Sequence, residues 1–302
     1  MNRKTATEVF AGVLLFGAIG TYHESMIGIA LFAAGRGAGC TWEGAARAIR
    51  NSRLDVATKG ELKAGSRRIA RDGELEEWET ARGKFWIPAG SFEALLKDLA
   101  EQDRDIYTTR QVGVRPGDVV LDCGANIGLY TRTALAAGAS QVVAIEPSPR
   151  NLECLRRNQA AAIAAGHVLV LPKGVWDKDD ILPMHRDPDN AAADTFVPEM
   201  AGKGDVINLP LTTIDKIAAE LGLQRVDFIK MDIEGAERNA LRGAASVIAR
   251  HHPRMAISAY HRRDDVTVIP ATIRGISPGY RTDCTQCIVG ELRIQPTVFM
   301  FF

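Results

Sequence analysis

Residues 119–131 of the chain read VVLDCGANIGLYT, and this stretch decides the fold class. Its first residues form a short apolar run, as in a buried strand, and Gly124 and Gly128 follow closely. Glycines let the main chain turn sharply and approach a ligand, and a helix that starts after such a turn offers its N-terminal amide groups. The stretch therefore predicts a strand, a ligand-binding turn and a helix.

The alternation of short apolar runs with helical stretches continues through the chain. Further strands are expected at residues 141–147, 167–174, 226–232, 254–260 and 296–302. We therefore predict an α/β protein with a doubly wound, mostly parallel sheet and helices on both faces. We expect the last apolar strand to be inserted beside its neighbour rather than added at the edge of the sheet.

Three parts are predicted along the chain. Residues 1–50 hold an apolar N-terminal segment, residues 51–110 a linker, a hairpin and a lid helix, and residues 111–302 the main domain. The hairpin is expected over residues 75–90, and Ser91 is expected to cap the helix that follows.

Two segments of the main domain are less regular. Residues 175–208 suit a loop or a short antiparallel excursion, and we expect this segment and the lid to shape the pocket for an acceptor. Residues 280–289, YRTDCTQCIV, are expected to form a helix.

Charge and cysteine content exclude some classes of partner. The chain has 302 residues, of which 37 are basic and 37 are acidic, so no global field attracts nucleic acid or an anionic membrane. Five scattered cysteines do not indicate a disulfide framework, and we expect a reducing, cytoplasmic location. Cys284 and Cys287 form one C-x-x-C pair, which we interpret as small strand or hairpin residues rather than a zinc or redox site.

The N-terminus is unusually apolar. Residues 9–20 and 26–35 form two apolar runs with a polar break between them. Neither run reaches the roughly 20 residues that a membrane-spanning helix needs, and one longer helix would place His23 and Glu24 near its centre. Two interpretations stay open: peripheral membrane contact through residues 9–34, or a helical pair docked on the domain or on a second copy.

Polar residues stand at the predicted ends of the strands. In open α/β sheets ligands bind beyond the carboxyl ends of the strands, where Asp122 and Glu146 stand. The turn reads Asp-x-Gly-x-Asn-x-Gly instead of the dinucleotide pattern G-x-G-x-x-G, and a carboxylate at Asp122 would repel a pyrophosphate. It suits an ammonium group, which points to S-adenosyl-L-methionine, a cofactor without phosphate. Glu146 would accept hydrogen bonds from both ribose hydroxyls.

The chain resembles the FkbM-like methyltransferases, within the larger class of Rossmann-like methyltransferases. The resemblance covers about residues 84–302 and rests on VVLDCGANIGLYT, on AIEPSPRNLECLRRN, on LTTIDKI leading into VDFIKMDIEGAE, and on AISAYH. It implies a seven-stranded sheet with an antiparallel last strand, here preceded by an N-terminal helical or hairpin extension. It also implies a cofactor site with Asp122, Gly124, Asn126 and Gly128 at the methionine end, Glu146 at the ribose, and Gly174 and Val175 at the adenine.

Methyl transfer is an in-line displacement at a sulfonium methyl group, so an oxygen acceptor needs a group that removes its proton. The catalytic candidates are Asp232, Glu234 and His261, and His261 is the preferred general base because histidine titrates near neutrality. We predict no metal, because no vicinal pair of aspartates accompanies the three residues, although they could in principle hold a divalent cation. Three aromatic residues could cover the sulfonium or simply pack in the core: Tyr107, Phe85 and Trp86.

The first functional hypothesis is an S-adenosyl-L-methionine-dependent methyltransferase. The resemblance implies that its acceptor is a small hydroxylated molecule such as a sugar, a polyketide or a lipid-like compound. An NAD(P)-dependent oxidoreductase on the same fold is the alternative, and a non-catalytic cofactor-binding scaffold is a third hypothesis. No nucleic-acid partner is expected, and the oligomeric state stays open.

Overall fold

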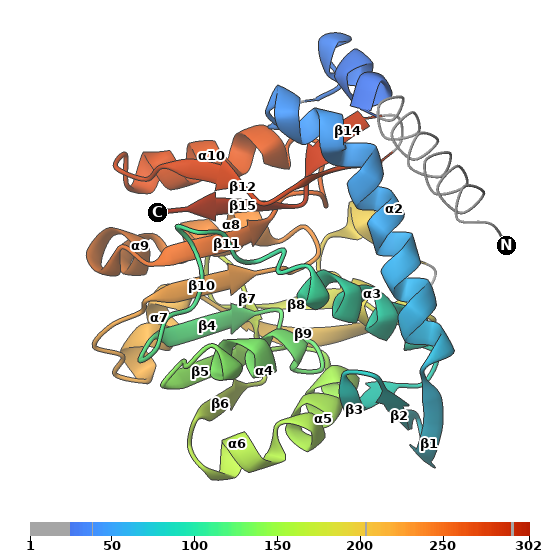
Figure 1. Cartoon of the computed structure of the whole chain (residues 1–302). Coiled ribbons are helices and arrows are strands. Elements are labelled where there is room, and N and C mark those ends of the chain that lie inside the picture. The colour runs from blue at the N-terminus through green and yellow to red at the C-terminus, as the bar shows by residue number, and fades with distance from the viewer. Residues whose placement is uncertain (1–24, 38, 203, 291–292) are drawn as a thin grey trace, which may run out of the picture.

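The computed structural model describes residues 25–37, 39–202, 204–290 and 293–302. A seven-stranded sheet lies at its centre, with the strand order β12–β15–β11–β10–β4–β5–β6 (Figure 1). The strands of this sheet are β4 (Val119–Cys123), β5 (Gln141–Ile145), β6 (Val168–Leu171), β10 (Phe228–Met231), β11 (Arg254–Ser258), β12 (Thr282–Cys284) and β15 (Val298–Phe301).

The pairing of the strands confirms the predicted sheet. Neighbouring strands from β11 to β6 are parallel, whereas β15 is antiparallel to both β11 and β12, between which it is inserted. The helix predicted over residues 280–289 is wrong. These residues form β12 and β13 (Cys287–Gly290), because β12 pairs with β15 and β13 pairs with β14 (Arg293–Pro296).

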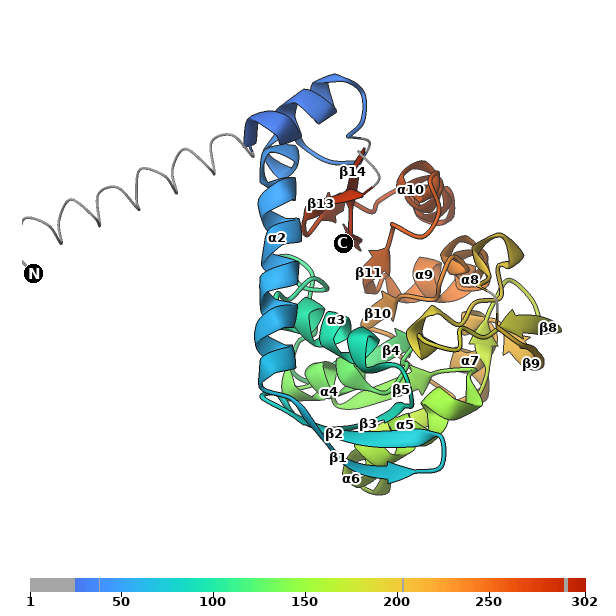
Figure 2. The same ribbon diagram turned by 90° about the vertical axis from the view of Figure 1, so that its right-hand side faces the viewer.

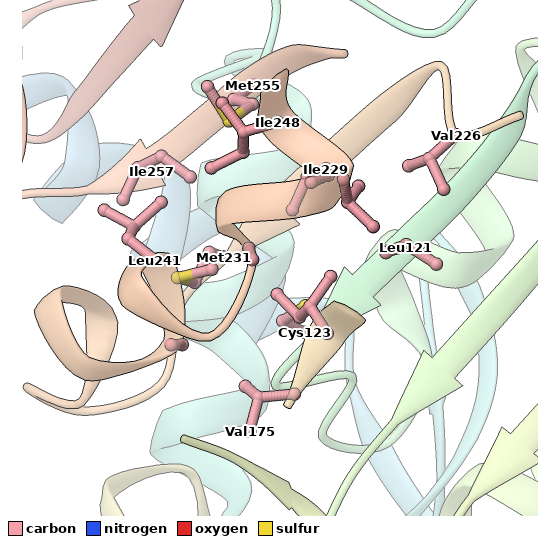
Figure 3. Close-up of a cluster of buried hydrophobic side chains, with 14 of the residues drawn as sticks. Leu121, Cys123, Val175, Val226, Ile229, Met231, Leu241, Ile248, Met255 and Ile257 are labelled. Carbon is pink, nitrogen blue, oxygen red and sulfur yellow. The ribbon is translucent and has the colours of Figure 1, made fainter. Parts of the chain in front are cut away.

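Apolar cores cover both faces of the sheet. Because side chains alternate along a strand, Leu121 and Cys123 of β4 lie on one face and Val120 lies on the other. The first face packs against α7, α8, α9 and α10, and Figure 3 shows this cluster. The second face packs against α4, α5 and α6. These helices are α4 (Leu129–Ala136), α5 (Pro149–Asn158), α6 (Ala160–Ala164), α7 (Ile214–Glu220), α8 (Glu237–Arg242), α9 (Ala245–His251) and α10 (Asp265–Ile276).

A small antiparallel sheet and one helix precede the central sheet in the sequence. β2 (Leu75–Thr80) and β3 (Gly83–Pro88) form the predicted hairpin, and β1 (Arg67–Asp72) pairs with β2. Figure 2 shows this sheet beside α5. Ser91 takes the N-cap position of α3 (Phe92–Asp103), but its hydroxyl does not cap the helix. It accepts a hydrogen bond from the N–H of Ala191 at 3.1 Å instead, so it joins α3 to the loop around Ala191.

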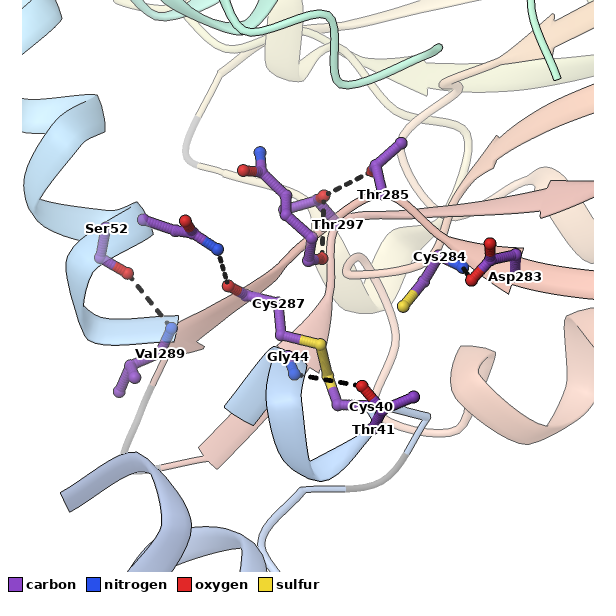
Figure 4. Close-up of a disulfide and its surroundings, with 12 residues drawn as sticks. Cys40, Thr41, Gly44, Ser52, Asp283, Cys284, Thr285, Cys287, Val289 and Thr297 are labelled. Carbon is purple, nitrogen blue, oxygen red and sulfur yellow. Dashed lines mark hydrogen bonds between the residues drawn. A yellow bond between two sulfur atoms is a disulfide. The ribbon is translucent and has the colours of Figure 1, made fainter. Parts of the chain in front are cut away.

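The long helix α2 (Trp42–Ala64) runs beside α3, from the β13–β14 hairpin to the small sheet (Figures 1 and 2). A disulfide between Cys40 and Cys287 joins the start of α2 to β13, with 6.3 Å between the two Cα atoms (Figure 4). The scattered cysteines of the sequence did not indicate this disulfide. The pairing partners are 247 positions apart, and only the packing of α2 on β13 brings them together.

Of the C-x-x-C pair, only Cys287 belongs to the disulfide, and Cys284 keeps a free thiol. Disulfides are typical of oxidising compartments, so the cysteines no longer favour the cytoplasmic location, which stays a prediction.

A three-stranded sheet follows β6, as the prediction of an antiparallel excursion allowed. β8 (Asp180–His185) is antiparallel to β9 (Val206–Thr212), and the short β7 (Gly174–Val175) is parallel to β9. The segment between β8 and β9 contains two short 3₁₀ helices, Ala191–Ala193 and Pro198–Met200.

The N-terminal predictions are only partly within the described residues. The first apolar run and the polar break lie in residues 1–24, outside the part of the chain that the structure describes. Residues 25–33 are helical. Among the described residues, every helix is too short or too polar to cross a bilayer. Peripheral membrane contact and the three-part division of the chain stay predictions, and the oligomeric state stays open.

Candidate functional site

Two clefts meet beyond the carboxyl ends of the central strands. The first, here called the Glu146 cleft, is lined by Ile145, Glu146, Val175, Met184 and Phe196 among others. The second, the Lys97 cleft, is lined by four residues of α3 together with Lys230 and three tyrosines, among others. Five residues line both clefts, and we call them the shared wall: Gly124, Asn126, Ala192, Asp232 and Glu234.

The glycine turn after β4 is held against the turn after β10. Gly124 has a φ of 75°, and a Cβ added there would lie 2.0 Å from the carbonyl oxygen of Asp232. Asn126 and Gly128 also have positive φ angles, of 50° and 88°. Gly128 stands at the N-cap of α4, as expected from the sequence, but it lines neither cleft.

Asp122 does not open onto either cleft. Its side chain is fully buried and lines neither of them, so its expected place at the methionine end of the cofactor stays a prediction. One carboxylate oxygen accepts a hydrogen bond from the hydroxyl of Thr131 at 2.6 Å, and the other lies 3.5 Å from Nζ of Lys230. Side chains alternate between the two faces of the sheet along β4, and this alternation directs Asp122 toward α4. Its partner in the register with β10 is Lys230.

Lys230 connects Asp122 to the glycine turn. Its ammonium group donates a hydrogen bond to the carbonyl oxygen of Gly124 at 2.9 Å. Burial alone would lower the pKa of Lys230, but the carboxylates of Asp122 and Asp232 outweigh it and raise that pKa. The sequence analysis missed this lysine, although a lysine inside an otherwise apolar strand was a visible signal. Asp122 therefore supports the turn through Lys230.

Glu146 lies in its cleft as predicted. Its carboxylate accepts hydrogen bonds from the N–H of Asn126 at 2.9 Å and from the N–H of Ser148 at 2.8 Å. Burial raises the pKa of Glu146 to about 7, although these two hydrogen bonds oppose the shift. Gly174 and Val175 line the same cleft, so the structure brings the expected ribose and adenine positions together.

The catalytic candidates converge at the ends of β10 and β11. Nε2 of His261 lies 3.4 Å from Oδ1 of Asp232 and 3.5 Å from Oε1 of Glu234. Nδ1 of His261 lies 2.9 Å from Oε1 of Glu237, which is fully buried. Glu234 has a φ of 51°, a conformation that is uncommon for a residue with a side chain. The three candidates thus form one cluster, as expected.

His261 is poorly placed to act as the general base. Its side chain is only 3% exposed, and it lines neither cleft. Burial lowers the pKa of His261, but Glu237 and Glu234 oppose burial strongly enough to raise that pKa well above its usual value. Asp232 and Glu234, in contrast, line both clefts. The choice of His261 as the general base stays a prediction, which its burial and its carboxylate neighbours do not favour.

Asp232 has two further partners. Tyr107 donates a hydrogen bond from its hydroxyl to Oδ2 of Asp232 at 2.6 Å. Burial raises the pKa of Asp232, but Lys230, His261 and Tyr107 together bring it to about 2. Of the three aromatic candidates, Tyr107 lines the Lys97 cleft, whereas Phe85 and Trp86 pack around the small sheet and line neither cleft.

The lid helix α3 supplies charged residues that the sequence analysis missed. Asp98 lies 3.1 Å from the side-chain nitrogen of Asn126, and burial raises its pKa to about 6. Burial also raises the pKa of Glu101, to about 8. Lys97 and Tyr260 complete this side of the Lys97 cleft. Their contribution depends on how α3 is docked, so no local pattern could have revealed it.

Comparisons with known proteins identify the family of the chain. The family described as "Methyltransferase FkbM domain" matches residues 122–281. The 31-O-demethyl-FK506 methyltransferase FkbM of Streptomyces tacrolimicus is 29% identical over 186 residues, which are 52% of this chain and 70% of that protein. Methyltransferase sdnD of Sordaria araneosa is 28% identical over 153 residues, 41% of this chain and 59% of that protein.

A methyltransferase FkbM structure from Methylobacillus flagellatus KT is 23% identical, with a TM-score of 0.45, over 84% of this chain and 59% of that chain. The family match covers the glycine turn, Glu146 and the cluster around Asp232. It favours the methyltransferase hypothesis over the oxidoreductase and scaffold hypotheses. The chain belongs to the FkbM methyltransferase domain family and is a methyltransferase.

Proposed function

We propose that the enzyme transfers a methyl group from S-adenosyl-L-methionine to an oxygen of a small hydroxylated acceptor, such as a sugar, a polyketide or a lipid-like molecule. The observation that carries this proposal is the shared wall, because one cleft can hold the cofactor and the other the acceptor on the two sides of Asp232 and Glu234. The Streptomyces relative is named for methylating 31-O-demethyl-FK506, which is also an oxygen acceptor.

The Glu146 cleft suits the adenosine part of the cofactor. Its wall combines the apolar side chains of Val175, Met184 and Phe196 with one carboxylate, that of Glu146. Apolar groups suit the adenine ring, and the carboxylate oxygens can accept hydrogen bonds from both ribose hydroxyls. A pyrophosphate, in contrast, would meet the carboxylates of Asp232 and Glu234.

The Lys97 cleft suits the acceptor. When the acceptor oxygen attacks, the bond between the methyl carbon and sulfur breaks, a carbon–oxygen bond forms, and S-adenosylhomocysteine leaves. The hydroxyl proton passes to a carboxylate. We assign this step to Glu234, since Glu234 lines both clefts and its side chain is 23% exposed. Asp232 would orient the acceptor, because Tyr107 already occupies its Oδ2.

Isothermal titration of the full chain with S-adenosylhomocysteine and, separately, with NADH tests the proposal. We expect S-adenosylhomocysteine to bind at one site per chain and NADH to give no heat. Glu146→Ala should weaken binding at least tenfold, whereas Glu153→Ala, an exposed change on α5 outside both clefts, should not. Binding of NADH, or equal affinity in the two variants, would contradict the proposal.

A further inference from the structure

The imidazole of His261 faces two carboxylates without a hydrogen bond to either. Its Nε2 atom is buried and lacks a hydrogen-bond partner among the described residues, and so does the nearest oxygen, Oδ1 of Asp232. The distances from Nε2 to Asp232 Oδ1 and to Glu234 Oε1 are 3.4 and 3.5 Å. A hydrogen bond between charged groups is normally about 2.7–2.9 Å long. Nε2 therefore lies at similar, long distances from one oxygen of each carboxylate.

The other side of the ring is held firmly. Nδ1 lies at hydrogen-bond distance from Oε1 of Glu237, and that oxygen also accepts a hydrogen bond from the N–H of Ile233 at 3.0 Å. In the neutral ring, a proton on Nδ1 leaves the lone pair of Nε2 directed at Asp232 and Glu234. A carboxylate that orients histidine in this way is the usual partner of a metal-binding histidine.

The two distances from Nε2 fit a metal ion held between the three side chains, whose ligand atoms lie within 4.8 Å of one another. Two ligands with metal bonds of about 2.1 Å lie about 3.4 Å apart when the angle at the metal is close to tetrahedral. The two distances from Nε2 agree with this value. We propose that Oδ1 of Asp232, Oε1 of Glu234 and Nε2 of His261 bind one divalent first-row transition-metal ion.

The ligand set narrows the choice of ion. Two carboxylate oxygens suit Mg²⁺, Ca²⁺ and Mn²⁺, whereas an imidazole suits transition metals. Mn²⁺ accepts both kinds of ligand, so it is the probe of choice. The proposal differs from the sequence-based expectation of no metal, which required a vicinal pair of aspartates. Here one turn after β10 supplies both carboxylates, those of Asp232 and Glu234. The segment that follows β11 supplies His261.

The ion would lie where the two clefts meet, because Asp232 and Glu234 belong to the shared wall. Three protein ligands would leave positions on the ion open for a hydroxyl oxygen of the acceptor. The ion would lower the pKa of that hydroxyl group. Glu234 binds through Oε1 and keeps Oε2 to accept the proton. This role rests on the proposed function, whereas the binding of the ion does not.

Titration of the chelator-treated full chain with Mn²⁺ tests the site, with heat measured by calorimetry and free Mn²⁺ measured by electron paramagnetic resonance. We expect one saturable site per chain. Glu234→Gln and Glu237→Gln should each weaken Mn²⁺ binding by about 10- to 100-fold, the first by removing a ligand and the second by releasing the ring of His261. Thermal unfolding of each variant shows that it is folded.

Two exposed substitutions serve as matched controls. His167→Gln and Glu220→Gln lie outside both clefts and should leave the Mn²⁺ affinity unchanged. S-adenosylhomocysteine is titrated into the same samples. Binding of this ligand without binding of Mn²⁺ or Zn²⁺ would overturn the metal site alone, and binding of Mn²⁺ alone would overturn the proposed function alone. Mn²⁺ binding that is equal in Glu234→Gln and in the controls would also overturn the site.

Discussion

The carbonyl oxygen of Asp232 lies in the space that a side chain on Gly124 would need. A Cβ on Gly124 would approach this oxygen to 2.0 Å. The turn after β4 and the turn after β10 are therefore in direct backbone contact, and they present the shared wall together. The positions of Asp232 and Glu234 depend on a glycine that is far away in the sequence.

Gly124→Ala should destabilise the protein by more than backbone strain alone explains. An alanine in this left-handed conformation costs about 1–2 kcal/mol, and the clash with Asp232 adds to it. Gly117→Ala is the matched control, because Gly117 has a φ of 86° but open space around a Cβ. Urea unfolding measures both. Equal losses of stability would show that the contact with Asp232 is unimportant.

Lys230→Met should destabilise the protein by about 3–5 kcal/mol, because it leaves the carboxylate of Asp122 buried without its cation. Lys216→Met removes an exposed partner of Asp179 and should cost less than about 1 kcal/mol. The two free energies of unfolding are compared at pH 7. A small effect at Lys230 would mean that Asp122 is neutral in the folded protein.

Stability should depend on the protonation of Glu146. Burial raises the pKa of Glu146 from 4.5 to about 7, so the folded chain holds this proton more tightly than the unfolded chain. The resulting stabilisation is complete below about pH 4.5 and is lost as the pH rises through 7, by up to about 3 kcal/mol. Urea unfolding of Glu146→Gln and of the original chain at pH 5, 6, 7 and 8 measures it. If the free energies of unfolding of the two proteins differ by the same amount at every pH, the pKa of Glu146 is not raised.

Cys40→Ser and Cys287→Ser should each lower the stability by about 2–4 kcal/mol through loss of the disulfide. Cys284→Ser, which removes a free thiol, is the control. A reductant should lower the melting temperature of the original chain and of Cys284→Ser, but not that of Cys40→Ser. Thiol titration of the unreduced, denatured chain should count three cysteines, and a count of five would show that the disulfide is absent.

Extracts of cells that express the enzyme should contain a compound about 14 Da heavier than its precursor, because a methyl group replaces a hydrogen. We expect the amount of this compound to fall strongly with Glu234→Gln and to stay unchanged with His167→Gln. Glu234 lines both clefts, whereas His167 lines neither. Mass spectrometry of metabolite and lipid extracts measures both. An undiminished compound with Glu234→Gln would exclude Glu234 as the proton acceptor.

Much of the central sheet could be predicted from local patterns. The apolar runs at β4, β5, β10 and β11 are short and alternate with helical stretches, which is the pattern of buried parallel strands. Residues 280–289 were predicted as a helix, and this prediction is wrong. Their strand conformation comes from pairing with β15 and β14, which lie later in the chain.

The sequence by itself determined the fold class, the glycine turn and the presence of polar residues at the ends of the strands, because each of these follows from neighbouring residues. Only the tertiary structure decided what these residues touch. It turned Asp122 away from the clefts toward Lys230, surrounded His261 with carboxylates, and joined Cys40 to Cys287. Burial and charge act over a few ångströms in space, and segments that are distant in the sequence supply both.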